Sequence, residues 1–422
     1  MLTTAVRLYG ENDLRLDRFE LPEIAPDEIL VKIISDSICM SSYKAASLGS
    51  RHKRVPADIA DHPIIIGHEF AGEVVQVGAK WQDRFPVGMR YAIQPALNYQ
   101  GSMDSPGYSF RYCGGAATYC ILPHQVMELG CLLPYQGDAY FQASLAEPMS
   151  CIIGAYHASF HTEAGSYVHQ MGIRPGGRLA ILAGAGPMGL GAVDFALHGN
   201  IQPRQLIVTD IDDGRLSRAA KLFTAEKAAA AGVELLFVNT ATMTDPVAGL
   251  LALTDGQGFD DVMVFAPVAP VCELADKILG HDGCLNFFAG PIDTQFSASL
   301  NYYNVHYNAT HVIGTTGGNT ADMQESLALS AAGKINPAVM VTHIGGLDCA
   351  AEATLKLPKI PGGKKLIYTG IALPLTAIDD FASLGQSNAL LAGLAEICSR
   401  HEGLWSDEAE KYLLANAQSI DA

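Results

Sequence analysis

The sequence is poor in positive charge and has no long apolar run. Its 422 residues include 27 Lys and Arg against 44 Asp and Glu, which gives a formal net charge of −17. A chain this acidic repels the phosphates of nucleic acids and of anionic membranes, so we expect neither as a partner. No apolar run reaches the length of about 20 residues that spans a membrane, and the N-terminal "MLTTAVRLYGENDLRL" lacks the layout of a signal peptide. These absences predict a soluble, cytoplasmic protein.

The cysteines are scattered and do not form a framework. There are nine of them, an odd number without regular spacing, which is typical of a protein from a reducing compartment. The apolar share of 49% and the charged share of 17% are ordinary for a globular chain. The length is sufficient for two domains.

Two patterns of secondary structure alternate along the chain. Residues 1–152 and 325–374 contain short strand-like runs separated by Gly, Pro and Asn, such as "TTAVRLYG" and "GHEFAGEVVQVG". In residues 153–324, short apolar runs alternate with Ala-rich helical stretches, which predicts an α/β region with a parallel sheet and crossover helices. Residues 375–422 form an amphipathic tail that we expect to be helical.

A glycine-rich turn lies in "LAILAGAGPMG". Gly184, Gly186 and Gly189 have G-x-G-x-x-G spacing, with Pro187 and Met188 between the last two, and they lie between a strand-like and a helical run. The first glycine permits the tight turn, the second lets the backbone approach a pyrophosphate, and the third packs the helix on the strand. We predict a Rossmann-type doubly wound sheet that binds a dinucleotide at this helix N-terminus.

The next strand-like run, "QLIVTD", ends at Asp210, which is placed to bind the ribose hydroxyls of the dinucleotide. Asp212 and Asp213 follow it. Three carboxylates would repel a 2′-phosphate, which favours NAD(H) over NADP(H). Arg215 leaves the alternative open, because its guanidinium suits such a phosphate, although it also fits a solvated helix face.

Four side chains have the chemistry of zinc ligands. Cys39 lies in "SDSICMSSYK", His68 and Glu69 lie in "IIIGHEFAG", and Glu147 lies in "SLAEPMSC". Zinc accepts thiolate, imidazole and carboxylate together. Each residue taken alone also fits an ordinary role, as a buried thiol, a core histidine or a carboxylate at a helix start.

The order and approximate spacing of these strings, followed by the glycine turn, resemble the zinc-dependent medium-chain dehydrogenase family over residues 1–372. The chain is most similar to its polyol and sugar-phosphate members, and particularly to reductases that act on L-sorbose 1-phosphate, through "HPIIIGHEF", "PGYSF", "DGCLNFFAGP" and "GTTGGNT". The resemblance implies a β-rich GroES-like catalytic domain over residues 1–152 and 325–374, and a Rossmann domain over residues 153–324.

The resemblance also implies one catalytic zinc ion for each chain. Cys39 and His68 are expected to bind it, and Glu69 and Glu147 to complete the shell directly or through water, which leaves a position open for substrate oxygen.

Many relatives carry a second, structural zinc held by four closely spaced cysteines. The matching region offers only Cys113 and Cys120, so we expect no structural zinc.

The residues after Cys39 depart from the family pattern. We expect Ser41, Lys44 and Glu69 to act in catalysis, with Ser41 matching the hydroxyl that passes on the substrate proton. Ser42 replaces a carboxylate that orients the zinc-bound histidine. Lys44 replaces the histidine at the solvent end of the proton relay, and it also fits a phosphate contact or a solvated surface position.

The segment "GSRHKRVP" stands out as basic in an acidic chain. Arg51, Lys53 and Arg54 fit either a solvated loop or an anion site for a substrate phosphate.

The expected function is therefore zinc-dependent reduction of a ketose phosphate by a nicotinamide cofactor, specifically of L-sorbose 1-phosphate to D-glucitol 6-phosphate. One alternative is a polyol or polyol-phosphate dehydrogenase, acting for example on galactitol 1-phosphate or sorbitol. Another is a nucleotide-binding regulator that has lost its chemistry. The family resemblance also implies a homodimer or homotetramer.

Overall fold

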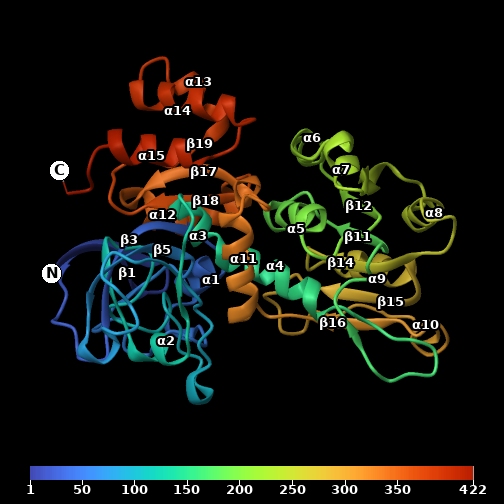
Figure 1. Ribbon diagram of the computed structural model, residues 1–422, viewed down its shortest axis with the longest axis horizontal. Helices are drawn as coiled ribbons and strands as arrows, with labels where there is room; N and C mark the ends of the chain where they lie inside the picture. Colours follow the sequence, from blue (N-terminus) through green and yellow to red (C-terminus); the bar gives the residue numbers. More distant parts are fainter. Residues whose placement is uncertain (422) are drawn as a thin grey trace. The chain divides into compact units, whose positions relative to one another are not determined.

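The computed structural model describes residues 1–421, and its contacts divide the chain into two compact units (Figure 1). The first contains residues 1–147, 323–333 and the chain from residue 341 onward, and the second contains residues 148–322 and 334–340. The predicted fold class is confirmed, because one unit is rich in β-strands and the other has a parallel sheet with crossover helices. The expected domain limits stay a prediction, and Ala422, the last residue of the expected tail, lies outside the described residues.

The first unit is built around one long central strand. That strand, β3, pairs with β5, β7 and β18, so both of its edges are occupied and nearly all of its side chains are buried. The larger sheet has the order β19-β17-β18-β3-β5-β6-β8, and a smaller sheet has the order β2-β1-β4. The strands are β1 (Leu2–Gly10), β2 (Asp13–Glu20), β3 (Ile29–Ile38), β4 (Ile64–Ile65), β5 (Phe70–Val77), β6 (Arg90–Ile93), β7 (Tyr119–Leu122), β8 (Leu132–Pro134), β17 (Val341–Gly346), β18 (Lys364–Tyr368) and β19 (Thr376–Ala377).

Short helices connect or cover these strands. The last two helices of the chain begin at side-chain caps. The Asn388 side chain accepts a hydrogen bond from the backbone N–H of Leu390, and the Ser406 hydroxyl accepts one from that of Ala409. The helices are α1 (Met40–Leu48), α2 (His124–Glu128), α3 (Tyr140–Ser144), α12 (Leu347–Lys356), α13 (Phe381–Leu384), α14 (Ala389–Arg400) and α15 (Asp407–Asn416), while α4 (Ala146–Ala158) and α11 (Thr320–Ala331) each run from one unit into the other.

The C-terminal segment is helical (Figure 1). The buried Glu410 of α15 bonds this segment to the rest of the first unit. Its carboxylate accepts from the Tyr368 hydroxyl of β18 at 2.8 Å and from the backbone N–H groups of Tyr140 and Phe141 at 2.6 and 2.8 Å. These two donors are the first N–H groups of α3, which a carboxylate satisfies well.

The second unit contains a six-stranded parallel sheet of order β13-β12-β11-β14-β15-β16. The strand order reverses at β11 and β14, the point where open α/β sheets bind ligands beyond the carboxyl ends of their strands. The elements are β9 (Phe160–His161), β10 (Gln170–Met171), β11 (Arg178–Leu182), α5 (Pro187–His198), β12 (Gln205–Asp210), α6 (Asp213–Leu222), α7 (Ala225–Ala230), β13 (Glu234–Asn239), α8 (Pro246–Ala252), β14 (Phe259–Val264), α9 (Ala269–Ile278), β15 (Leu279–Phe287), α10 (Tyr302–Tyr307) and β16 (His311–Gly314). Within residues 1–421, no helix combines the length and the apolar content that crossing a membrane requires.

Candidate active site

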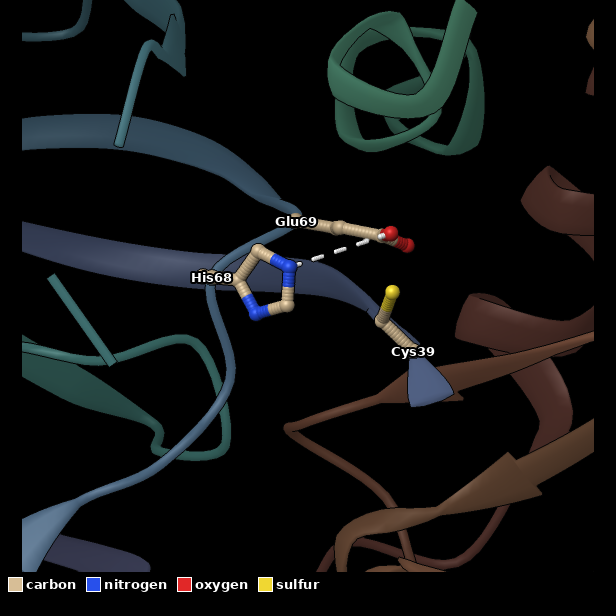
Figure 2. Close-up of side chains that lie close together, drawn as sticks. All are labelled: Cys39, His68 and Glu69. Atoms are coloured by element: carbon tan, nitrogen blue, oxygen red, sulfur yellow. Dashed lines mark ion pairs between the residues drawn. The ribbon is translucent and has the colours of Figure 1, made fainter. Parts of the chain in front are cut away.

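Three of the predicted metal ligands converge in the first unit. The thiol of Cys39, one ring nitrogen of His68 and a carboxylate oxygen of Glu69 all lie within 4.8 Å of one another, and their side chains point toward a common centre (Figure 2). His68 and Glu69 are buried, whereas Cys39 is partly exposed. Cys39 is therefore the member of the group that is most accessible to solvent.

Local backbone geometry brings these side chains together. β3 ends at Ile38, and Cys39 is the residue that precedes α1. Gly67 precedes His68 with φ +90, and a Cβ on it would lie 2.4 Å from a carboxylate oxygen of Asp36. Only glycine combines that φ with that close approach, so it directs His68 and Glu69 toward the end of β3.

Hydroxyl groups hold the His68 ring. The Ser42 hydroxyl lies 3.2 Å from Nδ1, and the hydroxyls of Ser41 and Tyr108 lie 3.3 and 3.4 Å from Nε2. Ser41 also donates to the Cys39 sulfur at 3.0 Å. Ser42 therefore holds the ring at Nδ1, and Nε2 is the nitrogen that faces Glu69, at 4.0 Å from its carboxylate.

Glu69 is paired with a lysine from β18. The Lys364 ammonium lies 2.5 and 2.6 Å from the two carboxylate oxygens, and the Ser37 hydroxyl donates to one of them. Burial opposes ionisation of Glu69, but Lys364, His68 and these hydrogen bonds outweigh it and lower its pKa. Both of its oxygens are therefore occupied by the protein itself.

Glu147 interacts with the group electrostatically but is not one of its three members. It lies in the first turn of α4, where desolvation and then the charge of Glu69 raise its pKa to about 7. Desolvation also raises the pKa of Cys39 and lowers that of His68. Burial thus disfavours the anionic forms of Glu147 and Cys39, and a divalent cation would offset that cost by stabilising thiolate and carboxylate.

The residues present fit a zinc ion. Thiol sulfur, imidazole nitrogen and carboxylate oxygen are the donors that zinc accepts, and they lie close together beside a second carboxyl group. Cys113 and Cys120, by contrast, lie in the buried core of the first unit. The absence of a structural zinc stays a prediction.

The remaining predicted catalytic residue lies on the helix that follows Cys39. Lys44 lies on α1, one turn beyond Ser41, and is partly exposed. Its charge contributes to a lowered pKa of His52, which is caused first by burial. A role of Lys44 in catalysis stays a prediction.

The glycine turn has the local geometry that its spacing predicted. It joins β11 to α5, and Gly186 precedes the first residue of that helix. A Cβ on Gly189 would lie 2.1 Å from the carbonyl oxygen of Gly184, whereas a Cβ on Gly186 would meet no atom within 4 Å. The third glycine therefore serves packing, and the second leaves open space for a ligand; Pro187 and Met188 form the first turn of α5.

Asp210 ends β12 and lies beside the same turn. One carboxylate oxygen accepts from the Ala185 N–H at 3.3 Å, and the other accepts from the Ile211 N–H at 2.8 Å. Arg215 is exposed in the first turns of α6, where its N–H donates to the capping Asp212. A role of these residues in binding a cofactor stays a prediction.

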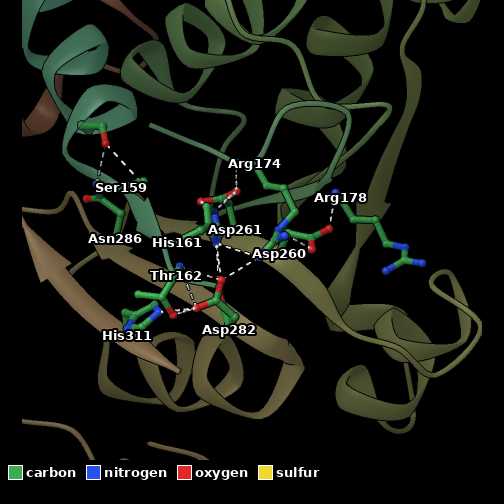
Figure 3. Close-up of polar contacts among 11 residues, drawn as sticks. Ser159, His161, Thr162, Arg174, Arg178, Asp260, Asp261, Asp282, Asn286 and His311 are labelled. Carbon is green, nitrogen blue, oxygen red and sulfur yellow. Dashed lines mark hydrogen bonds and ion pairs between the residues drawn. The ribbon is translucent and has the colours of Figure 1, made fainter. Parts of the chain in front are cut away.

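A second polar network lies in the second unit (Figure 3). His161 lies 3.2 Å from the Asp261 carboxylate and 2.9 Å from the Asp282 carbonyl, and the Asp282 carboxylate pairs with Arg174 at 2.7 Å and His311 at 2.8 Å. These residues lie at or near the amino ends of β14, β15 and β16, at the opposite edge of the sheet from the glycine turn. The network therefore ties β9 to the sheet, and we assign it a structural role.

The sequence did not predict a role in the site for Lys364, Ser37 or Tyr108. Lys364 begins β18 directly after two glycines, and the one available signal was the pair of adjacent lysines in "KKLIYTG". Both are buried, because Lys364 pairs with Glu69 and Lys365 donates to backbone carbonyls such as that of Gly363 at 2.6 Å.

Comparison with known proteins also indicates a zinc-binding enzyme. An alcohol dehydrogenase GroES-like domain matches residues 25–130, and a zinc-binding dehydrogenase domain matches residues 187–332. Mannitol-1-phosphate 5-dehydrogenase of Aliivibrio fischeri is 55% identical, over 98% of this chain and 97% of that protein. L-Sorbose 1-phosphate reductase of Klebsiella pneumoniae is 51% identical, over 99% and 98%.

Among solved structures, a Sinorhizobium meliloti 1021 protein described as a zinc-binding dehydrogenase bound to NADP has a TM-score of 0.69 at 20% identity, over 87% of this chain and 99% of that one. At this identity the match concerns the fold alone, while the two full-length relatives confirm the predicted resemblance. The chain belongs to the zinc-dependent medium-chain dehydrogenase family and is an oxidoreductase.

Proposed function

We propose that this oxidoreductase transfers hydride reversibly between a nicotinamide cofactor and a phosphorylated ketose or its polyol, and specifically reduces L-sorbose 1-phosphate to D-glucitol 6-phosphate. The observation that carries the proposal is the group of Cys39, His68 and Glu69, together with the Ser41 hydroxyl that contacts two of them. The two full-length relatives support the substrate class, since both are named for phosphorylated sugars or polyols.

Cys39, His68 and Glu147 are the residues that we assign to zinc. Glu69 is set aside as a direct ligand because Lys364 and Ser37 already occupy its two oxygens. Zinc held there would supply a Lewis acid that polarises the carbonyl group to be reduced. The Lys364–Glu69 pair contributes almost no net charge at the site.

Ser41 is the proton donor in this proposal. Its hydroxyl lies 3.0 Å from the Cys39 sulfur and 3.3 Å from His68 Nε2, so it faces the place where the substrate oxygen would bind. As hydride reaches the carbonyl carbon, the oxygen gains negative charge, and a hydroxyl within hydrogen-bonding distance delivers the proton. Lys44, which lies further along α1, is assigned to the solvent end of the proton relay that begins at Ser41.

The dinucleotide is assigned to the turn between β11 and α5. Open space at Gly186, the helix N-terminus and the carboxylate of Asp210 support this assignment. We propose NAD(H), because Asp212 and Asp213 add two further carboxylates beside Asp210.

A second candidate is a dehydrogenase that oxidises a polyol phosphate, which the 55% identity to mannitol-1-phosphate 5-dehydrogenase favours. The test is a panel of NADH- and NAD-dependent assays with L-sorbose 1-phosphate, D-glucitol 6-phosphate, mannitol 1-phosphate, galactitol 1-phosphate and L-sorbose. The proposal expects the highest kcat/KM for the L-sorbose 1-phosphate pair. A higher value for mannitol 1-phosphate would establish the second candidate, and a preference for L-sorbose itself would exclude both.

A further inference from the structure

Basic side chains gather on one buried tyrosine ring beside the metal-ligand group. Tyr108 is 4% exposed, its hydroxyl lies 3.4 Å from His68 Nε2, and the two rings lie 4.9 Å apart. His52 stacks on the tyrosine ring at 5.7 Å with the planes 12° apart. The guanidinium carbon of Arg54 lies 5.5 Å from the centre of that ring. One aromatic ring therefore separates the imidazole of the active site from an arginine and a second imidazole.

The guanidinium of Arg54 has no carboxylate partner among the described residues. Within residues 1–421, its guanidinium makes no ion pair with a carboxylate, although it is only partly exposed and the chain carries a net charge of −17. The charges that lower the pKa of His52, after the effect of burial, belong to Arg54, Lys53 and Lys44. A partly buried guanidinium without a carboxylate partner is stabilised when an anion binds to it.

The backbone at Arg54 is held in place. Its carbonyl accepts from the Ser109 hydroxyl at 2.7 Å, and its N–H donates to His52 Nδ1 at 3.3 Å. Because Nδ1 accepts this bond, the hydrogen of the His52 ring lies on Nε2, where it can be donated to a ligand. Arg54 and His52 are thus fixed to the loop that carries Tyr108.

We propose that Arg54 and His52 form a subsite for the phosphate ester of the substrate. The inference rests on the proposed function, since the substrate would react at the adjacent Cys39–His68 group. A guanidinium binds two phosphate oxygens through parallel hydrogen bonds, and an imidazole N–H supplies a further donor. Lys44 and Lys53 add positive potential around the site.

The proposal gives different roles to Arg51 and Arg54, the two arginines of the basic segment. Arg51 pairs with Glu11 at 2.6 Å, with side chains that are 65% and 50% exposed, so its charge is already matched by a carboxylate. It is therefore a matched control for Arg54, of the same residue type and three positions earlier. The sequence alone did not distinguish the two arginines.

The test compares Arg54→Gln, Arg54→Lys and Arg51→Gln in the zinc-loaded enzyme. Losing a charge-assisted contact is expected to raise the KM for L-sorbose 1-phosphate about 10- to 100-fold in Arg54→Gln, and to weaken competitive inhibition by inorganic phosphate to a similar extent. The kcat/KM for unphosphorylated L-sorbose and the Kd for NADH should stay at wild-type values. Arg54→Lys should recover part of the loss, and Arg51→Gln should match the wild type.

Three results would contradict these proposals in distinguishable ways. If Arg54→Gln lowers the kcat/KM for both sugars equally, the arginine is structural and the subsite is excluded. If it raises the Kd for NADH and leaves the KM for the sugar phosphate unchanged, the arginine serves a cofactor phosphate instead. If the wild-type enzyme itself does not prefer the phosphorylated sugar, the proposed substrate class fails before the variants are considered.

Discussion

The ammonium of Lys364 lies 2.5 and 2.6 Å from the two carboxylate oxygens of Glu69, and the two side chains are 7% and 1% exposed. The partners are 295 positions apart in the chain. Their pairing joins β18, from the C-terminal part of the first unit, to the residues that precede β5. The pair leaves Glu69 ionised next to Cys39 and His68 without adding net charge.

Replacing Lys364 by methionine should destabilise the protein strongly. The change keeps much of the side-chain length but leaves the Glu69 carboxylate buried without a counter-charge, which costs about 3–5 kcal/mol. Urea unfolding of the metal-free protein measures the loss. Lys80→Met is the control, because Lys80 pairs with Glu128 at the surface, where solvent screens the pair, and the loss there should be much smaller. Equal losses in the two variants would contradict the structural importance of the buried pair.

Replacing Ser42 by alanine should weaken zinc binding while the fold is retained. The Ser42 hydroxyl lies 3.2 Å from His68 Nδ1, and removal of a group that orients a metal-binding histidine lowers affinity about 10- to 100-fold. Competition with a chelator of known affinity measures the change. Ser47→Ala is the control on the same helix, since its hydroxyl donates to the Lys44 carbonyl at 3.1 Å. Unchanged zinc affinity in Ser42→Ala would remove the orienting role.

Two glycines of the nucleotide turn should respond differently to alanine. In Gly189→Ala the new methyl would lie 2.1 Å from the Gly184 carbonyl oxygen, so helix α5 must shift, and we expect a loss of about 1–3 kcal/mol in stability together with weaker NADH binding. In Gly186→Ala no atom lies within 4 Å, so stability should change by no more than about 0.5 kcal/mol while NADH binding still weakens. Thermal unfolding and NADH fluorescence titration separate the two effects. Tight NADH binding by Gly186→Ala would contradict the assignment of that space to the cofactor.

Glu410 should make stability depend on pH. Burial is the first cause that raises its pKa, to about 7 in the folded protein, whereas an unfolded glutamate titrates near about 4.3. Between these values the folded state binds more protons than the unfolded state, so the free energy of unfolding should fall as pH rises from about 4.5 to about 7, by up to about 3 kcal/mol. Above pH 7 the folded protein no longer gains stability from the protonated form of Glu410.

Urea unfolding at pH 5 and pH 7.5 tests this dependence. Glu410→Gln should remove the fall, because glutamine does not titrate, whereas Glu396→Gln, at an exposed position, should keep the wild-type slope. Identical slopes in the wild type and Glu410→Gln would contradict the prediction.

The parts predicted well from the sequence were those with local signals. The glycine turn is confined to a few residues between one strand and one helix, and its packing was predictable because each glycine meets a specific local constraint. The convergence of Cys39 with His68 and Glu69 was expected from the order of family strings, since spacing alone does not place residues 29 positions apart.

The features that the sequence did not predict depend on packing between residues that are far apart in the chain. Lys364 has no signal in its own strand, because burying a lysine is favourable only next to a carboxylate that lies far away in the chain. Tyr108 and His68 meet across 40 positions, and the difference between Arg51 and Arg54 depends on Glu11. These relationships belong to the tertiary structure.

The most direct test of the central claim measures zinc content and turnover on the same samples of the wild type, Cys39→Ser and His68→Ala. The proposed function predicts about one zinc ion per wild-type chain, in agreement with three or four protein donors around one ion. Each variant should lose zinc and turnover of L-sorbose 1-phosphate while its Kd for NADH stays near the wild-type value. Undiminished turnover in zinc-free wild-type enzyme, or in Cys39→Ser, would contradict a zinc-dependent reaction at this site.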